Sequence, residues 1–168
     1  NNIDILTIRS GRINSANSNF ERGVSEFFIS RNILKFGKKY FDKNKCDLII
    51  WYSPTIFFGS AINSLKKKYN CKVYLILRDL FPQWAIDTGI IRNKFVIYFL
   101  KYYEKLQYKI SDKIGVQSPK NLEYFDNSNL NLEVLYNWTD IRNKFQNFKS
   151  NYRKKFNLEN KFVIVYGG

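Results

Sequence analysis

The sequence predicts an α/β protein built on a doubly wound parallel sheet, and three observations lead to this fold class. Short β-branched or apolar runs alternate with longer segments of helical periodicity along most of the 168 residues. The run from Asp47 to Tyr52 is apolar without alternation, which is typical of a strand buried on both faces of a parallel sheet. Polar or glycine-containing residues follow the runs, as expected where parallel strands end.

Each element of the first half follows from its local pattern. Ile3–Ile8 is rich in isoleucine and stops at a glycine-containing stretch, so it predicts the first strand. Phe20–Phe41 places apolar residues at helical spacing with charged residues between them and predicts a helix. Asp47–Tyr52 predicts the second strand, and Thr55 is a candidate cap for a helix that runs to about Tyr69.

The second half continues the alternation. The sequence predicts a strand Lys72–Leu77, an irregular segment Arg78–Gly89 and a helix Asn93–Ile110. A strand Lys113–Gln117, a helix that starts at Ser118-Pro119 and a strand Leu132–Tyr136 follow. A short basic helix Tyr152–Leu158 and a sixth strand Lys161–Tyr166 end the series. Ser118 suits the cap position and Pro119 the first helical position. The polar stretch Asp140–Ser150 predicts a boundary before the last strand.

Composition excludes several classes of protein and of site. A hydrophobic fraction of 45% excludes disordered and low-complexity chains, and no apolar run approaches the roughly 20 residues that cross a bilayer. The lack of His excludes most hydrolase triads and zinc sites. Cys46 and Cys71 form neither a metal motif nor a disulfide framework, which favours a reducing compartment. No dinucleotide or P-loop glycine motif is present.

The net charge of +14 has two explanations of equal weight. It suits a nucleic-acid or anionic-membrane partner, or it reflects the A+T-rich codons shared by the abundant Lys, Asn, Ile, Tyr and Phe. Phe20–Phe41 and Asn93–Ile110 interleave aromatic with basic residues, as in helices that dock on an anionic leaflet. The alternative is a pair of helices with inward aromatic residues and solvated lysines. This alternative is favoured for Asn93–Ile110, and the two explanations balance for Phe20–Phe41.

The most unusual stretch runs from Arg78 to Trp84. A charged pair directly after an apolar strand has to leave the core. Asp79 there can orient or deprotonate a hydroxyl group, and Arg78 can hold a phosphate or carboxylate. The structural alternative is an ion pair that closes the strand end, with Phe81 and Trp84 in the core, and spacing alone favours that alternative.

Four segments then carry a family resemblance: Ile50–Gly59, Tyr74–Asp87 (YLILRDLFPQWAID), Ser111–Leu122 and Val134–Trp138. In this order they resemble family 4 glycosyltransferases of bacterial surface-polysaccharide clusters, most of all transferases of N-acetyl-L-fucosamine and related amino sugars. Tyr136 stands where the family usually has Pro, and many members carry His at the position of Arg78.

The resemblance implies the N-terminal, acceptor-side half of a GT-B fold. Residues 1–139 would be a Rossmann-like domain without its first strand, and residues 140–168 a linker with the opening helix and strand of a truncated nucleotide-sugar-binding domain. It implies a retaining transferase that moves a sugar from a nucleotide-sugar donor to a polyprenyl-diphosphate-linked glycan in O-antigen or capsule synthesis. The expected location is cytoplasmic or peripheral on the inner face of the cell membrane, where an anionic surface is a further partner.

The resemblance and the predicted strand ends together give the candidate site. Asp79 and Arg78 are the candidate catalytic residues. The candidate acceptor or cleft residues are Ser53, Pro54, Gln83, Trp84, Gln117, Ser118 and Asn137, and Gly167 and Gly168 would begin the donor-diphosphate loop.

No cofactor and no metal are expected, because the resemblance implies that the donor is a substrate bound through the missing half. The sequence contains no Met, so we expect an N-terminus that is cut, processed or incomplete. The resemblance implies that the groups that stabilise the nucleotide leaving group lie in the missing half, so we expect the chain to be inactive by itself. The alternative function is a non-catalytic, basic Rossmann-like module that binds an anionic membrane or nucleic acid, although no nucleic-acid recognition motif is present.

Overall fold

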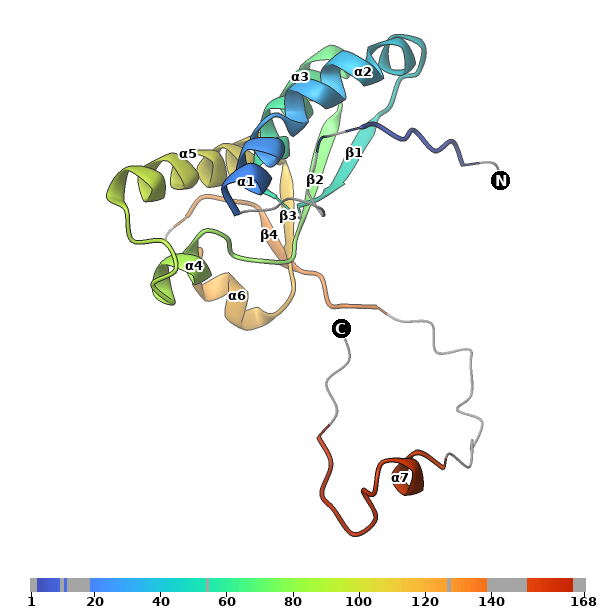
Figure 1. The fold of residues 1–168 in the computed structure, drawn as a ribbon. Helices are drawn as coiled ribbons and strands as arrows, with labels where there is room; N and C mark the ends of the chain where they lie inside the picture. The colour runs from blue at the N-terminus through green and yellow to red at the C-terminus, as the bar shows by residue number, and fades with distance from the viewer. Residues whose placement is uncertain are drawn as a thin grey trace. The chain divides into compact units, whose positions relative to one another are not determined.

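A parallel sheet of four strands, in the spatial order β1-β2-β3-β4, organises the first part of the chain (Figure 1). The strands are β1 (Leu48–Tyr52), β2 (Lys72–Leu77), β3 (Lys113–Val116) and β4 (Leu132–Val134). The computed structural model describes residues 3–9, 11, 19–53, 55–126, 128–138 and 151–164. It divides the chain into the units Asn1–Tyr136 and Asn137–Gly168. These four strands confirm the sequence prediction to within two residues at each end.

The helices alternate with the strands as the sequence predicts. They are α1 (Asn19–Phe27), α2 (Ile29–Lys43), the 3-10 helix η1 (Ile56–Phe58), α3 (Gly59–Tyr69), α4 (Gln83–Asp87), α5 (Lys94–Ile110), α6 (Pro119–Glu123) and α7 (Tyr152–Lys155). The single helix predicted for Phe20–Phe41 is therefore two helices that meet at Phe28.

The side chains of Asn93 and Ser118 cap α5 and α6. Asn93 accepts hydrogen bonds from the backbone N–H groups of Phe95 and Val96, and Ser118 accepts one from the N–H of Asn121. Thr55 makes no capping bond with its side chain, and its carbonyl oxygen accepts a hydrogen bond from Ser53 Oγ.

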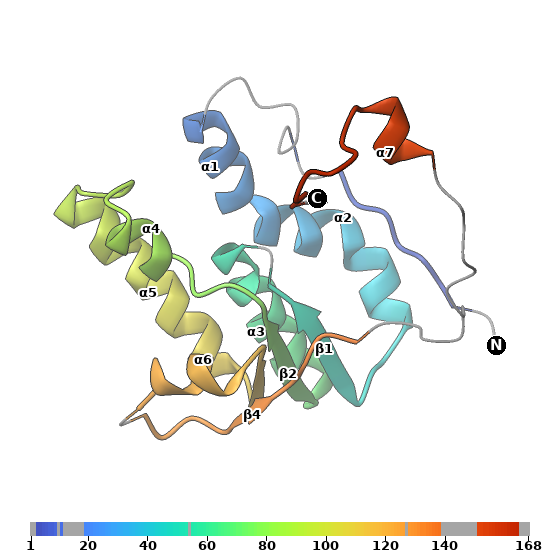
Figure 2. The same ribbon diagram turned by 90° about the horizontal axis from the view of Figure 1, so that it is seen from below.

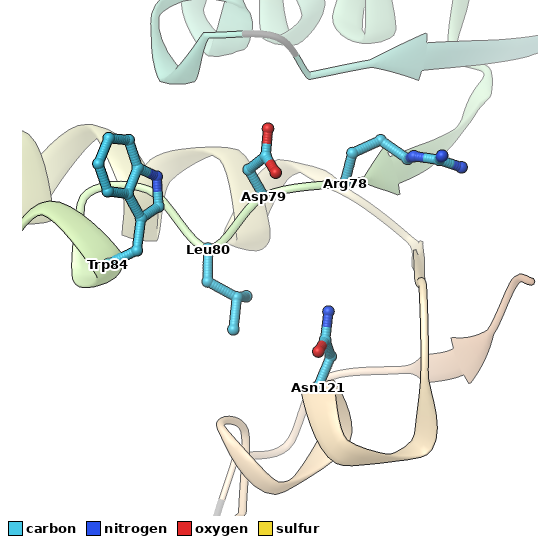
Figure 3. Close-up of a pocket in the computed structure, with 5 residues that line it drawn as sticks. All are labelled: Arg78, Asp79, Leu80, Trp84 and Asn121. Atoms are coloured by element: carbon cyan, nitrogen blue, oxygen red, sulfur yellow. The ribbon is translucent and has the colours of Figure 1, made fainter. Parts of the chain in front are cut away.

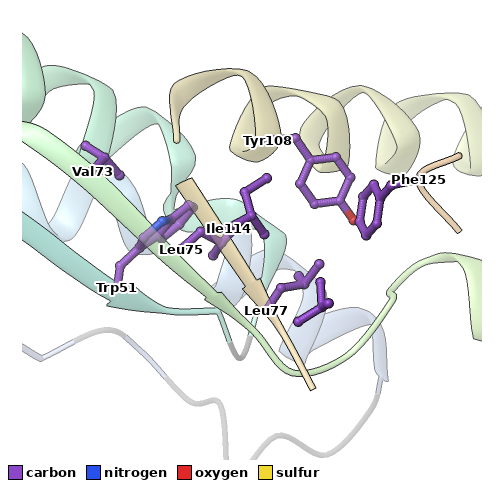
Figure 4. Close-up of a cluster of buried hydrophobic side chains, with 8 residues drawn as sticks. Trp51, Val73, Leu75, Leu77, Tyr108, Ile114 and Phe125 are labelled. Carbon is purple, nitrogen blue, oxygen red and sulfur yellow. The ribbon is translucent and has the colours of Figure 1, made fainter. Parts of the chain in front are cut away.

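One face of the sheet is buried beneath α3, α5 and α6 (Figures 1 and 4). The core on this face consists of Trp51, Val73, Leu75, Leu77, Tyr108, Ile114, Val116 and Phe125. A second cluster of Ile29, Ile56, Phe57 and Leu100 joins α2, η1 and α5. The strands step in one direction across the sheet, and right-handed crossovers place successive helices of such a sheet on the same face.

The opposite face of β1 is open to solvent. Leu48, Ile50 and Tyr52 alternate with the buried or half-buried Ile49 and Trp51, and all three are exposed. The apolar run of β1 predicted a strand that is buried on both faces. This prediction is wrong, because no helix among the described residues covers the second face of β1. The α/β class and the parallel sheet are confirmed. The doubly wound arrangement, with helices on both faces, is not seen in the described part of the chain.

Two further strands that the sequence predicts are not formed in the described residues. Ile3–Ile8 forms no strand, and Ile3 and Ile5 are exposed. Residues 161–164 also form no strand, and residues 165 and 166 lie outside the described part. Neither segment pairs with a described strand, so its backbone lacks the hydrogen-bonded ladder that defines a sheet.

Buried Glu104, which is 2% exposed, ties α5 to the segment after α6. Its Oε2 lies 2.8 Å from Lys101 Nζ, and the hydroxyl groups of Tyr108 and Tyr124 donate to Oε1 at 3.1 and 2.9 Å. Lys101 also donates to the Tyr124 hydroxyl at 2.7 Å. Burial and the neighbouring Glu104 raise the pKa of Tyr108 far above its usual value, so this tyrosine remains a neutral donor.

Glu104→Ala is expected to lower the free energy of unfolding by about 3 kcal/mol, because it leaves a partly buried ammonium group and two hydroxyls without their acceptor. Urea unfolding followed by circular dichroism measures the loss. Glu123→Ala, at an exposed position of α6, is the matched control and should change little. Equal losses for the two variants would contradict a stabilising role for the Glu104 network.

Asp112 joins α3, β2 and β3 at the amino-terminal edge of the sheet. Its Oδ2 lies 2.8 Å from Lys66 Nζ and accepts the backbone N–H of Val73 at 2.8 Å. Its own N–H donates to the Val73 carbonyl at 2.8 Å. The hydrogen bond from Lys66, more than the bond from Val73, holds the pKa of Asp112 below its ordinary value of 3.8.

A lowered folded pKa makes stability depend on pH in a definite direction. The stabilisation that ionised Asp112 gives the folded state is fully present above the pKa of about 3.8 that Asp112 has in the unfolded chain. It is lost as pH falls through the pKa of Asp112 in the folded chain. We expect the free energy of unfolding to fall below pH 4 in the unmodified chain and to fall less in Asp112→Asn, measured in urea between pH 6 and 2.5. Asp126→Asn, at an exposed position, is the control and should keep the pH dependence of the unmodified chain.

Candidate functional site

A pocket of about 410 Å³ lies at the carboxyl edge of the sheet, where β2 and β3 end (Figure 3). Its lining consists of Arg78, Asp79, Leu80, Trp84 and Asn121. The first three residues follow β2, Trp84 belongs to α4, and Asn121 belongs to α6. Of the candidate site residues selected from the sequence, Arg78, Asp79 and Trp84 line this pocket, and Asn121 is a further polar residue of the lining.

The loop after β2 leaves the core abruptly. Leu77 is the last buried residue of β2, Arg78 is half-buried and Asp79 is exposed. Asp79 and Trp84 extend on one side of the loop, whereas Leu80 points the other way, toward Asn121 (Figure 3). Asp79 is thus an exposed carboxylate in the lining of the pocket.

Trp84 is held at the mouth of this pocket by its own short helix. Its backbone N–H donates to the Leu80 carbonyl at 3.2 Å, and its carbonyl accepts the Thr88 hydroxyl at 2.8 Å. Its ring contacts the Phe81 ring with a centroid distance of 6.0 Å, yet the residue is 48% exposed. An aromatic side chain that is anchored on one side and open on the other offers a flat binding surface.

Asn121 is oriented by the capping residue of α6. Ser118 Oγ donates to Asn121 Oδ1 at 3.1 Å and accepts the Asn121 N–H at 3.3 Å. The carbonyl end of the amide is thus engaged, and its nitrogen points toward the loop that carries Asp79 (Figure 3). Asn121 consequently presents hydrogen-bond donors to the pocket.

Neither Arg78 nor Asp79 forms an ion pair with a residue that the structure describes. The structural alternative for this stretch, an ion pair that closes the strand, is therefore not formed. Phe81 does pack against the second hydrophobic cluster, as that alternative expects, but Trp84 does not enter the core. The pocket combines a cation and a carboxylate that have no ion-pair partner among the described residues with amide donors and an aromatic face.

Two other candidate residues have partners inside the protein. Ser53 is buried, and its Oγ donates to Gln107 Oε1 at 2.8 Å. Gln83 donates to Asp87 Oδ1 at 2.7 Å along α4. Neither side chain lines the pocket.

The remaining candidates are spread over other parts of the chain. Gln117 and Ser118 precede α6 without lining the pocket, and Asn137 is exposed in the second unit. Pro54, Gly167 and Gly168 lie outside the described residues.

Asn121 and Leu80 are the pocket residues that the sequence reasoning did not select. Asn121 had a local signal, because a Ser-Pro helix start after a parallel strand places the third helical residue near the carboxyl edge of the sheet. Leu80 had no comparable signal, since its exposure depends on how the loop turns.

No protein-family model matches the chain, and no curated protein matches it either. Within the described residues, no group of three or more His, Cys, Asp or Glu side chains could hold a metal ion.

Arg78→Ala and Asp79→Ala are each expected to change the free energy of unfolding by less than about 0.5 kcal/mol, because neither side chain forms an ion pair with a described residue. Urea unfolding at neutral pH measures the change. Lys66→Ala, which removes the nearer of the two lysine partners of Asp112, should cost distinctly more. A loss at Arg78 or Asp79 as large as that at Lys66 would assign these residues a structural role.

Proposed function

We propose that this chain is the acceptor-side, Rossmann-like half of a retaining GT-B glycosyltransferase. The enzyme would move a sugar from a nucleotide-sugar donor to a polyprenyl-diphosphate-linked glycan during bacterial surface-polysaccharide synthesis. One observation carries the proposal: Arg78 and Asp79, neither of which forms an ion pair with a described residue, share a pocket with Trp84 and Asn121 at the carboxyl edge of a parallel sheet.

Each pocket residue suits one part of a lipid-linked sugar. The Arg78 guanidinium can bind a phosphate oxygen pair in bidentate geometry. The Asp79 carboxylate can accept a hydrogen bond from a sugar hydroxyl, and the Asn121 amide can donate one to another sugar oxygen. The exposed Trp84 ring can cover the apolar face of the pyranose. A ligand with hydroxyls, an apolar ring face and a diphosphate would use all four residues.

The proposed reaction assigns Asp79 a direct part in the chemistry. The acceptor hydroxyl oxygen forms a bond to the anomeric carbon of the donor sugar on the face from which the nucleotide diphosphate departs. The bond from that carbon to the diphosphate breaks, and the anomeric configuration is retained. Asp79 orients the hydroxyl and takes its proton as the new bond forms. The nucleotide diphosphate leaves with the electron pair of the broken bond, and groups that stabilise it would belong to the donor-binding half.

The family resemblance supports the same location. Of the four similar segments, Ile50–Gly59 covers the end of β1 and the start of α3, Tyr74–Asp87 covers β2 through α4, and Ser111–Leu122 covers β3 and α6. These segments lie on consecutive strands of one sheet and lead into its carboxyl edge. The fold is compatible with a Rossmann-like domain. The GT-B assignment and the role of residues 140–168 as the start of a donor domain belong to the proposal.

Binding of a short acceptor analogue tests the proposal on this chain. N-acetylglucosamine linked to farnesyl diphosphate is titrated into the chain by isothermal calorimetry. Arg78→Ala should weaken binding by about tenfold or more, because it removes a charge-assisted hydrogen bond to phosphate. Arg31→Ala, at an exposed position of α2, is the matched control and should leave the affinity unchanged. Equal affinities for Arg78→Ala and the unmodified chain would contradict the proposed site.

Transfer is tested on the complete polypeptide that contains this chain, with candidate UDP-sugars and membrane lipid acceptor. Asp79→Asn should lower the transfer rate by about a hundredfold while the analogue still binds. A complete polypeptide that transfers no sugar, or an Asp79→Asn variant with an unchanged rate, would overturn the enzymatic proposal.

A further inference from the structure

Helix α5 carries large aromatic side chains on its solvent side. Phe95, Tyr98 and Tyr102 are 87%, 78% and 58% exposed, and their spacing continues at Lys105 and Lys109 along one stripe of the helix. The opposite face, with Leu100, Glu104, Gln107, Tyr108 and Ile110, is buried. The interpretation that the aromatic residues of Asn93–Ile110 point inward is therefore wrong for these three, and the core does not account for them.

The exposed rings of α5 continue onto α1 and α2. Phe99 of α5 lies with its ring centroid 5.9 Å from that of Phe27, and Phe27 lies 5.3 Å from Phe28. All three residues are exposed. We define the aromatic surface as Phe27, Phe28, Phe95, Tyr98, Phe99 and Tyr102. Contiguous exposed apolar surfaces of this kind mark contact with a partner or a membrane.

Lysines make up four of the five charged residues of α5, the helix that carries most of the aromatic surface. Lys94, Lys105 and Lys109 of α5 are exposed and form no ion pair with a described residue. The one acidic residue of α5, Glu104, is buried and paired with Lys101. Glu26 on α1 is paired with Arg22. The chain as a whole carries +14.

We propose that the aromatic surface docks on an anionic lipid bilayer, with α5 lying in the plane of the interface. Tyrosine and phenylalanine rings suit the headgroup level, and lysines along the same stripe face anionic lipids. A second copy of the chain fits less well, because a two-fold contact would bring the same unpaired lysines toward one another. No helix among the described residues is long and apolar enough to cross a membrane.

The aromatic surface adjoins the element that carries Trp84. Six residues lie between the end of α4 and the start of α5, and the N–H of Ile91 donates to the Ala85 carbonyl at 3.0 Å, which folds the connection back on α4. Both views show α4 beside the N-terminal end of α5 (Figures 1 and 2). Docking through α5 would bring the pocket close to the lipid surface. The docking proposal stands on the exposed rings and charges and does not depend on the transfer reaction.

Vesicle flotation tests the docking surface directly. The 168-residue chain is mixed with vesicles of phosphatidylcholine alone or with one quarter phosphatidylglycerol. We expect flotation with the anionic vesicles, weakened as NaCl rises from about 50 to about 500 mM, and little flotation with the neutral ones. Failure to float with anionic vesicles at the lowest salt overturns the proposal.

Matched variants locate the surface. Tyr98→Ser/Tyr102→Ser should weaken binding by about tenfold, whereas Tyr52→Ser, at a similarly exposed tyrosine (54%) on the opposite face of the sheet, should not. Lys105→Glu/Lys109→Glu should abolish binding more completely than Lys39→Glu/Lys43→Glu, which makes the same charge change on α2. Circular dichroism spectra that match the unmodified chain show that the variants are folded. If each test variant and its control lost the same amount of vesicle binding, the contact would lie elsewhere and the proposal would be overturned.

Two further measurements distinguish other occupants. Light scattering after size exclusion reports self-association, and fluorescence anisotropy reports binding of a single-stranded oligonucleotide. A dimer that Tyr98→Ser/Tyr102→Ser dissolves, or oligonucleotide binding that the same variant removes while vesicles do not bind, would assign the aromatic surface to that occupant and overturn membrane docking.

Discussion

The parallel pairing of β2 with β1 on one side and β3 on the other is the constraint on which the rest of the structure depends. Parallel neighbouring strands need a crossover connection. Here successive strands follow one another in a single direction across the sheet, so right-handed crossovers place α3 and α5 on the same face. That face becomes the core around Leu75 and Ile114 (Figure 4). The same pairing brings the loops after β2 and β3 to one edge, and the pocket residues come from these loops and the short helices that follow.

Helix α5 has to satisfy two different surroundings at once. Toward the sheet it contributes Tyr108 and the buried Glu104, whose charge is tolerated because an ammonium group and two hydroxyls surround it. Toward solvent it presents Phe95, Tyr98 and Tyr102, which the fold leaves uncovered. A helix whose only task is to cover a sheet would carry charged residues at those outer positions. The outward rings are thus the feature of α5 that a purely structural role explains least.

Local sequence patterns predicted the four strands, α5 and the Ser118 cap well, because each depends on residues adjacent in the chain. Ile3–Ile8 has an equally strong strand pattern and forms none, since a strand also needs a neighbour with which to exchange backbone hydrogen bonds. Within the site, Arg78 and Asp79 could be selected as charges that leave an apolar strand. Asn121 reaches them from the next crossover, more than forty residues along the chain, through a sheet register that no local pattern contains.

The sequence by itself determined the α/β class, the order of the elements and the charged break after β2, because hydrophobic periodicity and turn residues act over a few positions. Only the tertiary structure decided which faces are buried. The apolar run of β1 is compatible with one covered face or two, and the rings of α5 are compatible with a core or a surface. These choices depend on which elements pack together, and packing joins residues far apart in the chain. For the same reason, the pocket and the aromatic surface could be identified only in the folded molecule.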